Sequence, residues 1–217
     1  VFSDIKTYAI NNNLPLYQFE SIKKQGVEVL SKLNADIMIT ASYGQILSKE
    51  VLDICEYGVL NIHASLLPKL RGASPVASAL LNGETKTGVT IMQTDVGLDD
   101  GKMLLKGEIE IDEKDNQQTL MDKLSVLGGE LIVKVLGDID NYVKNAESQN
   151  EEDATHCKKI TKQDALIDFS CDAVSINNKI RAFYGNPTAF FVCKDEVYKV
   201  FEGEVVKCNT KQAGEVM

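Results

Sequence analysis

The sequence has no tryptophan and only two histidines, and its cysteines are few and scattered. No apolar run reaches the roughly 18 residues of a membrane-spanning helix, so we expect no membrane span. The five cysteines show no CxxC spacing, which argues against both a zinc site and a disulfide framework. We therefore expect reduced thiols in a cytoplasmic protein that uses no metal.

Acidic residues outnumber basic residues, and the formal net charge of the 217 residues is −9. This balance argues against a general nucleic-acid binder, since such proteins neutralise phosphates with lysine and arginine. A local basic patch that binds RNA is still compatible with this negative net charge. No glycine-rich nucleotide-binding fingerprint is present, so chemistry based on NAD or ATP has no support.

Hydrophobic periodicity in the first 144 residues alternates between strand and helix patterns. Strand patterns occupy 36–41, 59–62, 87–94 and 103–111, with a short candidate at 16–19; helical patterns occupy 5–9, 27–33, 51–52, 75–81 and 120–135. The strand at 103–111 is expected to pair antiparallel with 87–94. This order predicts an α/β fold with a Rossmann-like, mostly parallel sheet and helices on both faces.

The composition changes after residue 144. Residues 145–155 are polar and acidic without apolar periodicity, which predicts an interdomain linker between a domain at 1–144 and a second at 156–217. A helix near 176–183 and alternation across 190–206 predict the start of a small, OB-like β-barrel. The chain begins with Val1 in a polar segment unlike a secretory signal, so we interpret it as a piece lacking its N-terminal part, with an incomplete second domain.

Two polar side chains at the end of one predicted strand are the first candidates for chemistry. Asn61 and His63 are two residues apart, so in an extended chain they project to the same side. An irregular loop follows, and Ser74-Pro75 then begins a helix, as at the carboxyl ends of strands in open α/β sheets. The alternative for Asn-x-His alone is a hydrogen-bonded histidine at a strand end.

Two longer strings extend this candidate site. NIHASLLPKLRGASP at 61–75 closely resembles the signature of the folate-dependent formyltransferases, and GVTIM (88–92) followed by GLDDG (97–101) resembles the segment carrying that family's catalytic aspartate. The resemblance implies the formyltransferase fold and 10-formyltetrahydrofolate as formyl donor. Within the family, the strings are most similar to the branch that formylates initiator methionyl-tRNA for translation initiation.

The resemblance also implies roles for individual residues. Asn61 would donate to the oxyanion of a tetrahedral intermediate, His63 would carry protons, and Asp99 would orient the imidazole. Asp100 would be a turn residue. The expected folate-binding residues lie in two loops, Gln45-Ile46-Leu47 and Ser65-Leu66-Leu67-Pro68, with Ser65 holding its loop in shape. The expected partners are folate and initiator methionyl-tRNA, bound by a monomer.

The sequence departs from the family pattern in two places. The family's first strand, first helix and basic loop should precede Val1, and RAFYGNP at 181–187 stands where the family usually reads RAFNPWP. The alternatives are a sister enzyme that formylates glycinamide ribonucleotide or an amino sugar, a formylfolate hydrolase, and a non-catalytic folate-binding homologue. KITKQDALIDF at 159–169 resembles the start of the second domain of the tRNA-directed branch and favours it.

Overall fold

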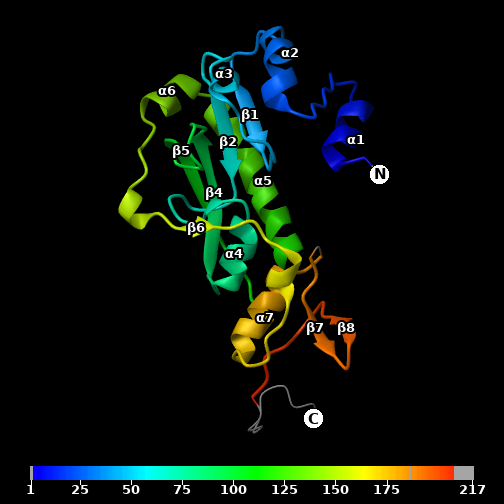
Figure 1. Ribbon diagram of the computed structural model, residues 1–217. Coiled ribbons are helices and arrows are strands. Elements are labelled where there is room, and N and C mark those ends of the chain that lie inside the picture. The colour runs from blue at the N-terminus through cyan, green and yellow to red at the C-terminus, as the bar shows by residue number, and fades with distance from the viewer. Residues whose placement is uncertain (1, 186, 208–217) are drawn as a thin grey trace.

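A four-stranded sheet forms the centre of the computed structural model, which describes residues 2–185 and 187–207 (Figure 1). The strand order is β1-β2-β4-β5, with bounds β1 Met38–Ala41, β2 Val59–His63, β4 Lys86–Gln93 and β5 Met103–Glu110. β1 pairs parallel with β2, in the register Thr40 to Asn61. No helix in the described part of the chain is long and apolar enough to cross a membrane.

The sheet is mixed, whereas a mostly parallel sheet was expected. β2 pairs antiparallel with β4, and β4 pairs antiparallel with β5, the second pairing as predicted. The reason lies in the connection after β2. The connection includes helix α4 (Pro75–Leu81), and the chain enters β4 from the His63 end of β2, so β4 runs in the opposite direction.

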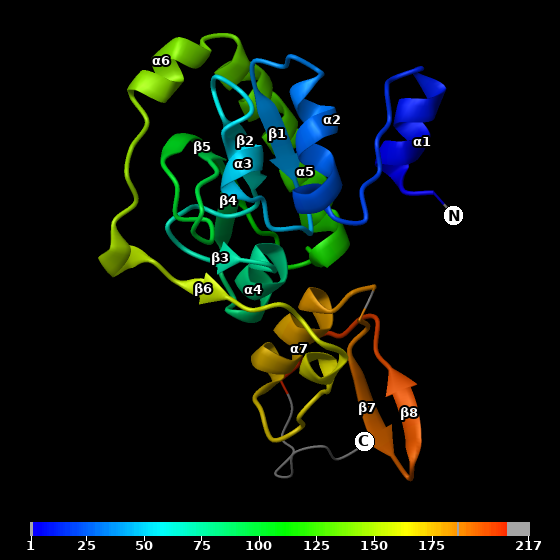
Figure 2. The ribbon, with the colours of Figure 1, turned by 45° about the horizontal axis from the view of Figure 1, so that its top comes forward.

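Helices cover both faces of the sheet, as the sequence predicted. The long helix α5 (Gln117–Leu136) packs against β4 and β5 behind the sheet, and its start is fixed by a capping box at Asn116. In Figure 2, the short helices α2 (Val27–Ser31) and α3 (Lys49–Leu52) lie on the side opposite α5. The main core lies under α5, where Leu60, Val89 and Ile91 are fully or almost fully buried.

The first residues form a separate layer beside β1. Helix α1 (Asp4–Asn11) matches the helical pattern at 5–9 and is capped by Ser3, and a π-helical turn (Ile22–Gly26) precedes α2. The candidate strand at 16–19 is wrong, because these residues have no regular structure. The Phe19 carbonyl instead accepts from the side chain of Gln45, and no strand among residues 2–185 and 187–207 pairs with this segment.

The segment after helix α6 (Ile139–Lys144) runs back across the face of the sheet opposite α5 (Figure 1). Glu147 bridges to Met103, and β6 (His156–Cys157) pairs parallel with β3 (Arg71–Gly72), after a 3₁₀ turn at Glu151–Asp153. We call residues 147–157 the strap. Most of the predicted linker is therefore bound to the loops of the sheet, while the domain boundaries at 144 and 156 stay a prediction.

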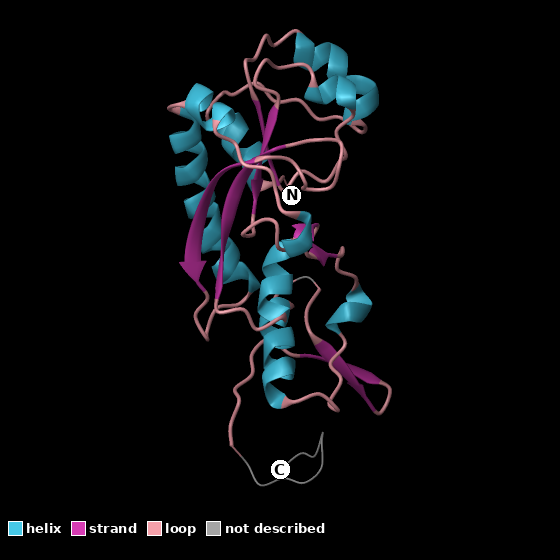
Figure 3. Ribbon diagram, turned by 90° about the vertical axis from the view of Figure 1, so that its left-hand side faces the viewer, coloured by secondary structure: helices cyan, strands magenta, loops and turns pink. Residues whose placement is uncertain are grey.

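The last described part packs against the end of the sheet domain. Helix α7 (Ala173–Ala182) follows a 3₁₀ turn at Lys162–Ala165 and contacts α4, so that Ile180 and Phe183 share the main core. Figure 3 shows the hairpin of β7 (Phe190–Cys193) and β8 (Glu196–Lys199) well separated from the main sheet. These are the two expected strands; a barrel stays a prediction, and residues 208–217 lie outside the described range.

Candidate active site

Asn61 and His63 lie on the face of β2 that points away from α5. Ile62, between them, faces α5, where a Cβ added at Gly128 would meet its side chain. The alternation of an extended strand therefore places the carboxamide and the imidazole together on the strap side of the sheet, as the sequence predicted. His63 is only 5% exposed, so its ring is held by its neighbours.

Both ring nitrogens of His63 face protein groups. Nε2 lies 3.0 Å from the carbonyl oxygen of Leu70. A carbonyl oxygen only accepts, so Nε2 carries the hydrogen in this contact and donates it. Nδ1 lies 3.7 Å from Oδ2 of Asp99. The ring is thus anchored through one nitrogen and presents the other to a carboxylate.

Asp99 and Asp100 diverge, as expected from their adjacent positions. Oδ2 of Asp99 accepts from the backbone N–H of Gly72 at 2.8 Å, in addition to facing His63. The exposed Asp100 carboxylate folds over its own turn, where a Cβ at Gly97 would meet it. The expected geometry of the two carboxylates is confirmed, whereas their roles remain predictions.

The carboxamide of Asn61 is oriented by a residue that the sequence reasoning missed. The Thr40 hydroxyl has two acceptors for its one hydrogen, Oδ1 of Asn61 at 3.1 Å and the Leu60 carbonyl at 3.3 Å, of which Oδ1 is the nearer. Nδ2 of Asn61 has no hydrogen-bond partner within residues 2–185 and 187–207, so its N–H groups are available to a ligand. The signal for Thr40 is its position opposite Asn61 in the parallel β1–β2 register, which periodicity alone does not give.

Two side-chain hydroxyl groups hold the loop after His63 through hydrogen bonds to its backbone carbonyls. The Ser65 hydroxyl donates to the Lys69 carbonyl at 2.6 Å, and the Thr90 hydroxyl donates to the Ser65 carbonyl at 2.7 Å. Ser65 thus holds its loop, as expected. Leu67 is buried against Met92 and Met103, so its side chain belongs to a small core, while Leu66 and Pro68 are half-buried.

The second expected folate loop leaves the same edge of the sheet, after β1. The Gln45 side chain is occupied within the fold, because it accepts from the Ile22 N–H at 2.8 Å and donates to the Phe19 carbonyl at 3.2 Å. Ile46 is 89% exposed and Leu47 is half-buried. Folate contacts of this loop and of residues 65–68 remain predictions.

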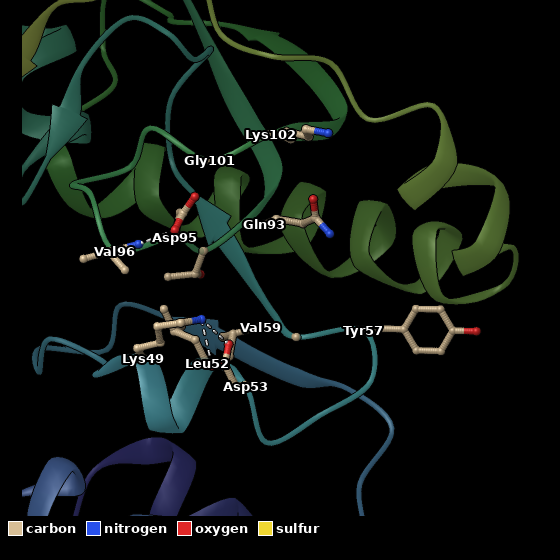
Figure 4. Close-up of a pocket in the computed structure, with 12 residues that line it drawn as sticks. Lys49, Leu52, Asp53, Tyr57, Val59, Gln93, Asp95, Val96, Gly101 and Lys102 are labelled. Atoms are coloured by element: carbon tan, nitrogen blue, oxygen red, sulfur yellow. Dashed lines mark hydrogen bonds and ion pairs between the residues drawn. The ribbon is translucent and has the colours of Figure 1, made fainter.

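A cavity of about 280 Å³ lies between α3 and the loop that carries Asp99 (Figure 4). Its lining residues are Lys49, Leu52, Asp53, Tyr57, Gly58, Val59, Gln93, Thr94, Asp95, Val96, Gly101 and Lys102. Asn61, His63 and Asp99 do not line it, but Gln93–Val96 and Gly101 flank the Asp99 turn on both sides. The sequence reasoning did not identify this cavity, because its walls come from four separate segments.

The strap contacts the loop after β2 and the Asp99 turn through side chains. Nε2 of Gln149 donates to the carbonyls of Asp99 and Gly101, each at 2.8 Å. Oε1 of Gln149 accepts from Nε of Arg71 at 2.9 Å. The Arg71 guanidinium, buried at the end of β3, donates to both carboxylate oxygens of Glu151 at 2.8 and 3.0 Å.

The Arg71–Glu151 pair is charge-assisted and bidentate. Its hydrogen bonds lower the pKa of the Glu151 carboxyl and raise the pKa of the Arg71 guanidinium from their ordinary values. Because a buried guanidinium without a partner is costly, Glu151 keeps the strap on the loop. Nothing in the sequence pattern singles out Gln149 or Glu151. Within the described residues, no three His, Cys, Asp or Glu side chains are grouped as metal ligands.

Known proteins match this chain over both of its parts. The family model for formyl transferase matches residues 4–136, and the model for the formyl transferase C-terminal domain matches residues 159–217. A methionyl-tRNA formyltransferase of Francisella tularensis subsp. novicida is 44% identical over 220 aligned residues, which cover 100% of this chain and 69% of that protein.

Two solved structures share the fold at low identity. Methionyl-tRNA formyltransferase from Clostridium thermocellum has a TM-score of 0.69 at 19% identity, covering 88% of this chain and 83% of the other. An N-formyltransferase from Helicobacter canadensis, in complex with folinic acid and dTDP-3-aminofucose, has a TM-score of 0.69 at 21% identity, covering 93% of this chain and 72% of the other. The family models and the full-length identity agree with the site geometry, and the chain belongs to the formyl transferase family.

Proposed function

We propose that this protein transfers a formyl group from 10-formyltetrahydrofolate to the amino group of initiator methionyl-tRNA, for translation initiation. The observation that carries the proposal is the grouping of Asn61, His63 and Asp99 at one end of β2, in a chain whose whole length matches a relative of that name. We expect the protein to act as a monomer.

Formyl transfer requires a donor for an oxyanion and a carrier for a proton. The amine attacks the formyl carbon, and the carbonyl oxygen becomes an oxyanion in the tetrahedral intermediate. Thr40 holds Oδ1 of Asn61, so the amide Nδ2–H groups are turned outward and serve as the oxyanion donor. This orientation is set before substrate binds, which lowers the reorganisation needed in the transition state.

His63 is suited to take the proton that the attacking amine loses. Its Nε2 hydrogen is engaged by Leu70, so Nδ1 is the nitrogen that accepts. The imidazolium formed in this way places positive charge beside the Asp99 carboxylate, which stabilises it. The same proton then passes to the folate nitrogen as the C–N bond to the formyl group breaks.

The cavity of Figure 4 is our candidate for the ring of the formyl donor. Helix α3, which begins two residues after the 45–47 loop, forms one wall of the cavity. Gln93–Val96, which precede the Asp99 turn, form another. Val59 and Leu52 supply apolar walls, while Asp95 and Thr94 supply polar groups, the combination that orients a flat heterocycle. A ring held there leaves its formyl-bearing arm next to the Asp99 turn.

Leu52→Trp is expected to raise KM for the formyl donor at least about 10-fold with little change in kcat, because the indole fills the cavity without touching His63. Steady-state kinetics over a range of donor concentrations measures both constants. Glu50→Trp makes an equally large change on α3 at an exposed position outside the cavity, and serves as the control. An unchanged KM in Leu52→Trp places the donor elsewhere.

Thr40→Val is expected to lower kcat about fivefold, the effect of one hydrogen bond of about 1 kcal/mol, and to leave both KM values unchanged. Valine keeps the shape of threonine but cannot fix Oδ1 of Asn61, so the amide loses its preferred orientation. Thr87→Val makes the same change on β4, away from Asn61, and should be silent. Equal kcat in wild type and Thr40→Val would show that Thr40 does not contribute to the rate of the reaction.

The acceptor is tested by offering the protein 10-formyltetrahydrofolate with methionyl-tRNA, glycinamide ribonucleotide or a dTDP-linked amino sugar. We expect formylation of methionyl-tRNA, supported by the name of the 44% identical relative and by the matched C-terminal domain model. Formylation of another acceptor alone would assign a sister activity. Donor binding without turnover on any acceptor would indicate a non-catalytic folate-binding homologue.

A further inference from the structure

We propose that Gln149, on the strap, is a positioning residue for formyl transfer, which holds Asp99 beside His63 from outside the two catalytic loops. The kinetic part of this inference rests on the proposed function. Its structural part concerns only the placement of the Asp99 turn and is measured without substrate.

The side-chain amide of Gln149 joins two segments that are far apart in sequence from each other and from the strap. Nε2 donates to the carbonyls of Asp99 and Gly101, so one nitrogen spans the turn on both sides of Asp100. Oε1 accepts from Arg71, which adjoins Gly72, the residue whose N–H binds the Asp99 carboxylate. Gln149 therefore connects the backbone of the Asp99 turn to the loop that follows His63.

The Asp99 turn requires such support. Asp99 has φ of 53°, in the left-handed region that non-glycine residues adopt rarely and at a cost. The Asp100 side chain is exposed and contacts its own turn, so it does not tie the turn to the rest of the fold. The two Gln149 bonds satisfy carbonyls on both sides of Asp100 and thereby favour the backbone conformation that aims Asp99 at His63.

The strap itself is fixed independently of Gln149. Arg71 and Glu151 form their bidentate pair, the Leu70 N–H donates to the Thr155 hydroxyl at 2.9 Å, and β6 pairs with β3. A change at Gln149 therefore removes the hold on the Asp99 turn while the strap stays in place. This separates a positioning effect from loss of the strap.

The decisive variant is Gln149→Glu, which keeps an acceptor for Arg71 but loses both N–H donors and places a carboxylate against two carbonyls. We expect kcat for formyl transfer to fall on the order of 10- to 100-fold, the cost of misplacing a catalytic group, with KM for the formyl donor unchanged. Gln149→Met, of similar length and without charge, should lose kcat similarly.

Asn150→Asp is the matched control. It makes the same amide-to-acid change at the next position, where the side chain hydrogen-bonds within the strap to the Glu152 N–H and the Asp153 carboxylate, and it should keep wild-type kcat. Wild-type kcat in both Gln149 variants would overturn the proposal. A loss of kcat in Asn150→Asp as large as that in Gln149→Glu would also overturn it, because the effect would then come from added charge on the strap.

A second readout uses the fact that the chain has only two histidines. In protein labelled with ¹⁵N-histidine, the ring signals of His63 are identified by their loss in His63→Ala. We expect Gln149→Met to move these signals in the same direction as Asp99→Asn does, and Asn150→Asp to leave them in place. His63 signals that stay at their wild-type positions in Gln149→Met would overturn the proposal.

The two readouts keep the proposals apart. If wild-type protein formylates none of the acceptors, the proposed function fails, and the His63 signals alone decide whether Gln149 positions Asp99. If wild type is active and the Gln149 variants keep its kcat, the inference about Gln149 fails while the proposed function stands.

Discussion

His63→Ala and Asn61→Ala are each expected to lower the rate of formyl transfer at least about 100-fold, while binding of the formyl donor stays largely intact. Removal of one preorganised oxyanion donor typically costs on the order of 100- to 1000-fold in rate, and loss of a general acid–base costs a similar amount. Both side chains lie at the end of β2, outside the cavity of Figure 4, so neither change alters the proposed donor pocket.

Single-turnover kinetics with saturating donor and methionyl-tRNA measures the chemical step, and titration of the donor measures binding. His156→Ala is the control for the first variant, because His156 is the other histidine of the chain and its side chain is exposed on the strap. A single-turnover rate within a few fold of wild type in either variant would remove that residue from the mechanism.

Asp99→Asn is expected to reduce turnover strongly, by about 100-fold or more, whereas Asp100→Asn is expected to be nearly silent. The Asp99 carboxylate lies 3.7 Å from Nδ1 of His63. The neutral amide that Asp99→Asn introduces would no longer stabilise the imidazolium that forms there. The Asp100 side chain is exposed and folds over Gly97, where an amide serves as well as a carboxylate.

The pair is its own matched control, since both variants make the same change in charge at adjacent positions. Steady-state turnover ranks them, and circular dichroism verifies that both fold. If Asp100→Asn is the more damaging of the two, or if both are equally mild, Asp99 is not the partner of His63.

Local sequence rules were sufficient for the side-chain pair on β2. An apolar run bounded by a glycine predicts the strand, and strict alternation then places Asn61 and His63 on one face; the structure has both features. The same rules predicted the helix that begins at Ser74-Pro75, where α4 has its proline in the first turn. These features depend on neighbours within a few residues, which the sequence displays directly.

The same rules were insufficient where pairing is non-local. The direction of β4 follows from the end of β2 at which the chain re-enters the sheet, and residues 16–19 form no strand in the structure. Thr40 acquires its contact with Asn61 only through the β1–β2 register. Periodicity reports which face a residue occupies and not which residue of another strand lies opposite.

The sequence by itself indicated the formyl transferase family and an α/β scaffold, and it identified an amide, an imidazole and a carboxylate as the candidates for the chemistry. Tertiary structure alone decided how that chemistry is held. The strap, predicted as a polar linker, brings Gln149 and Glu151 to Arg71 and the Asp99 turn, although they are distant in sequence from both loops. The physical reason is that the partners of a polar side chain depend on which segments the fold brings side by side, and hydrophobic periodicity carries no information about that arrangement.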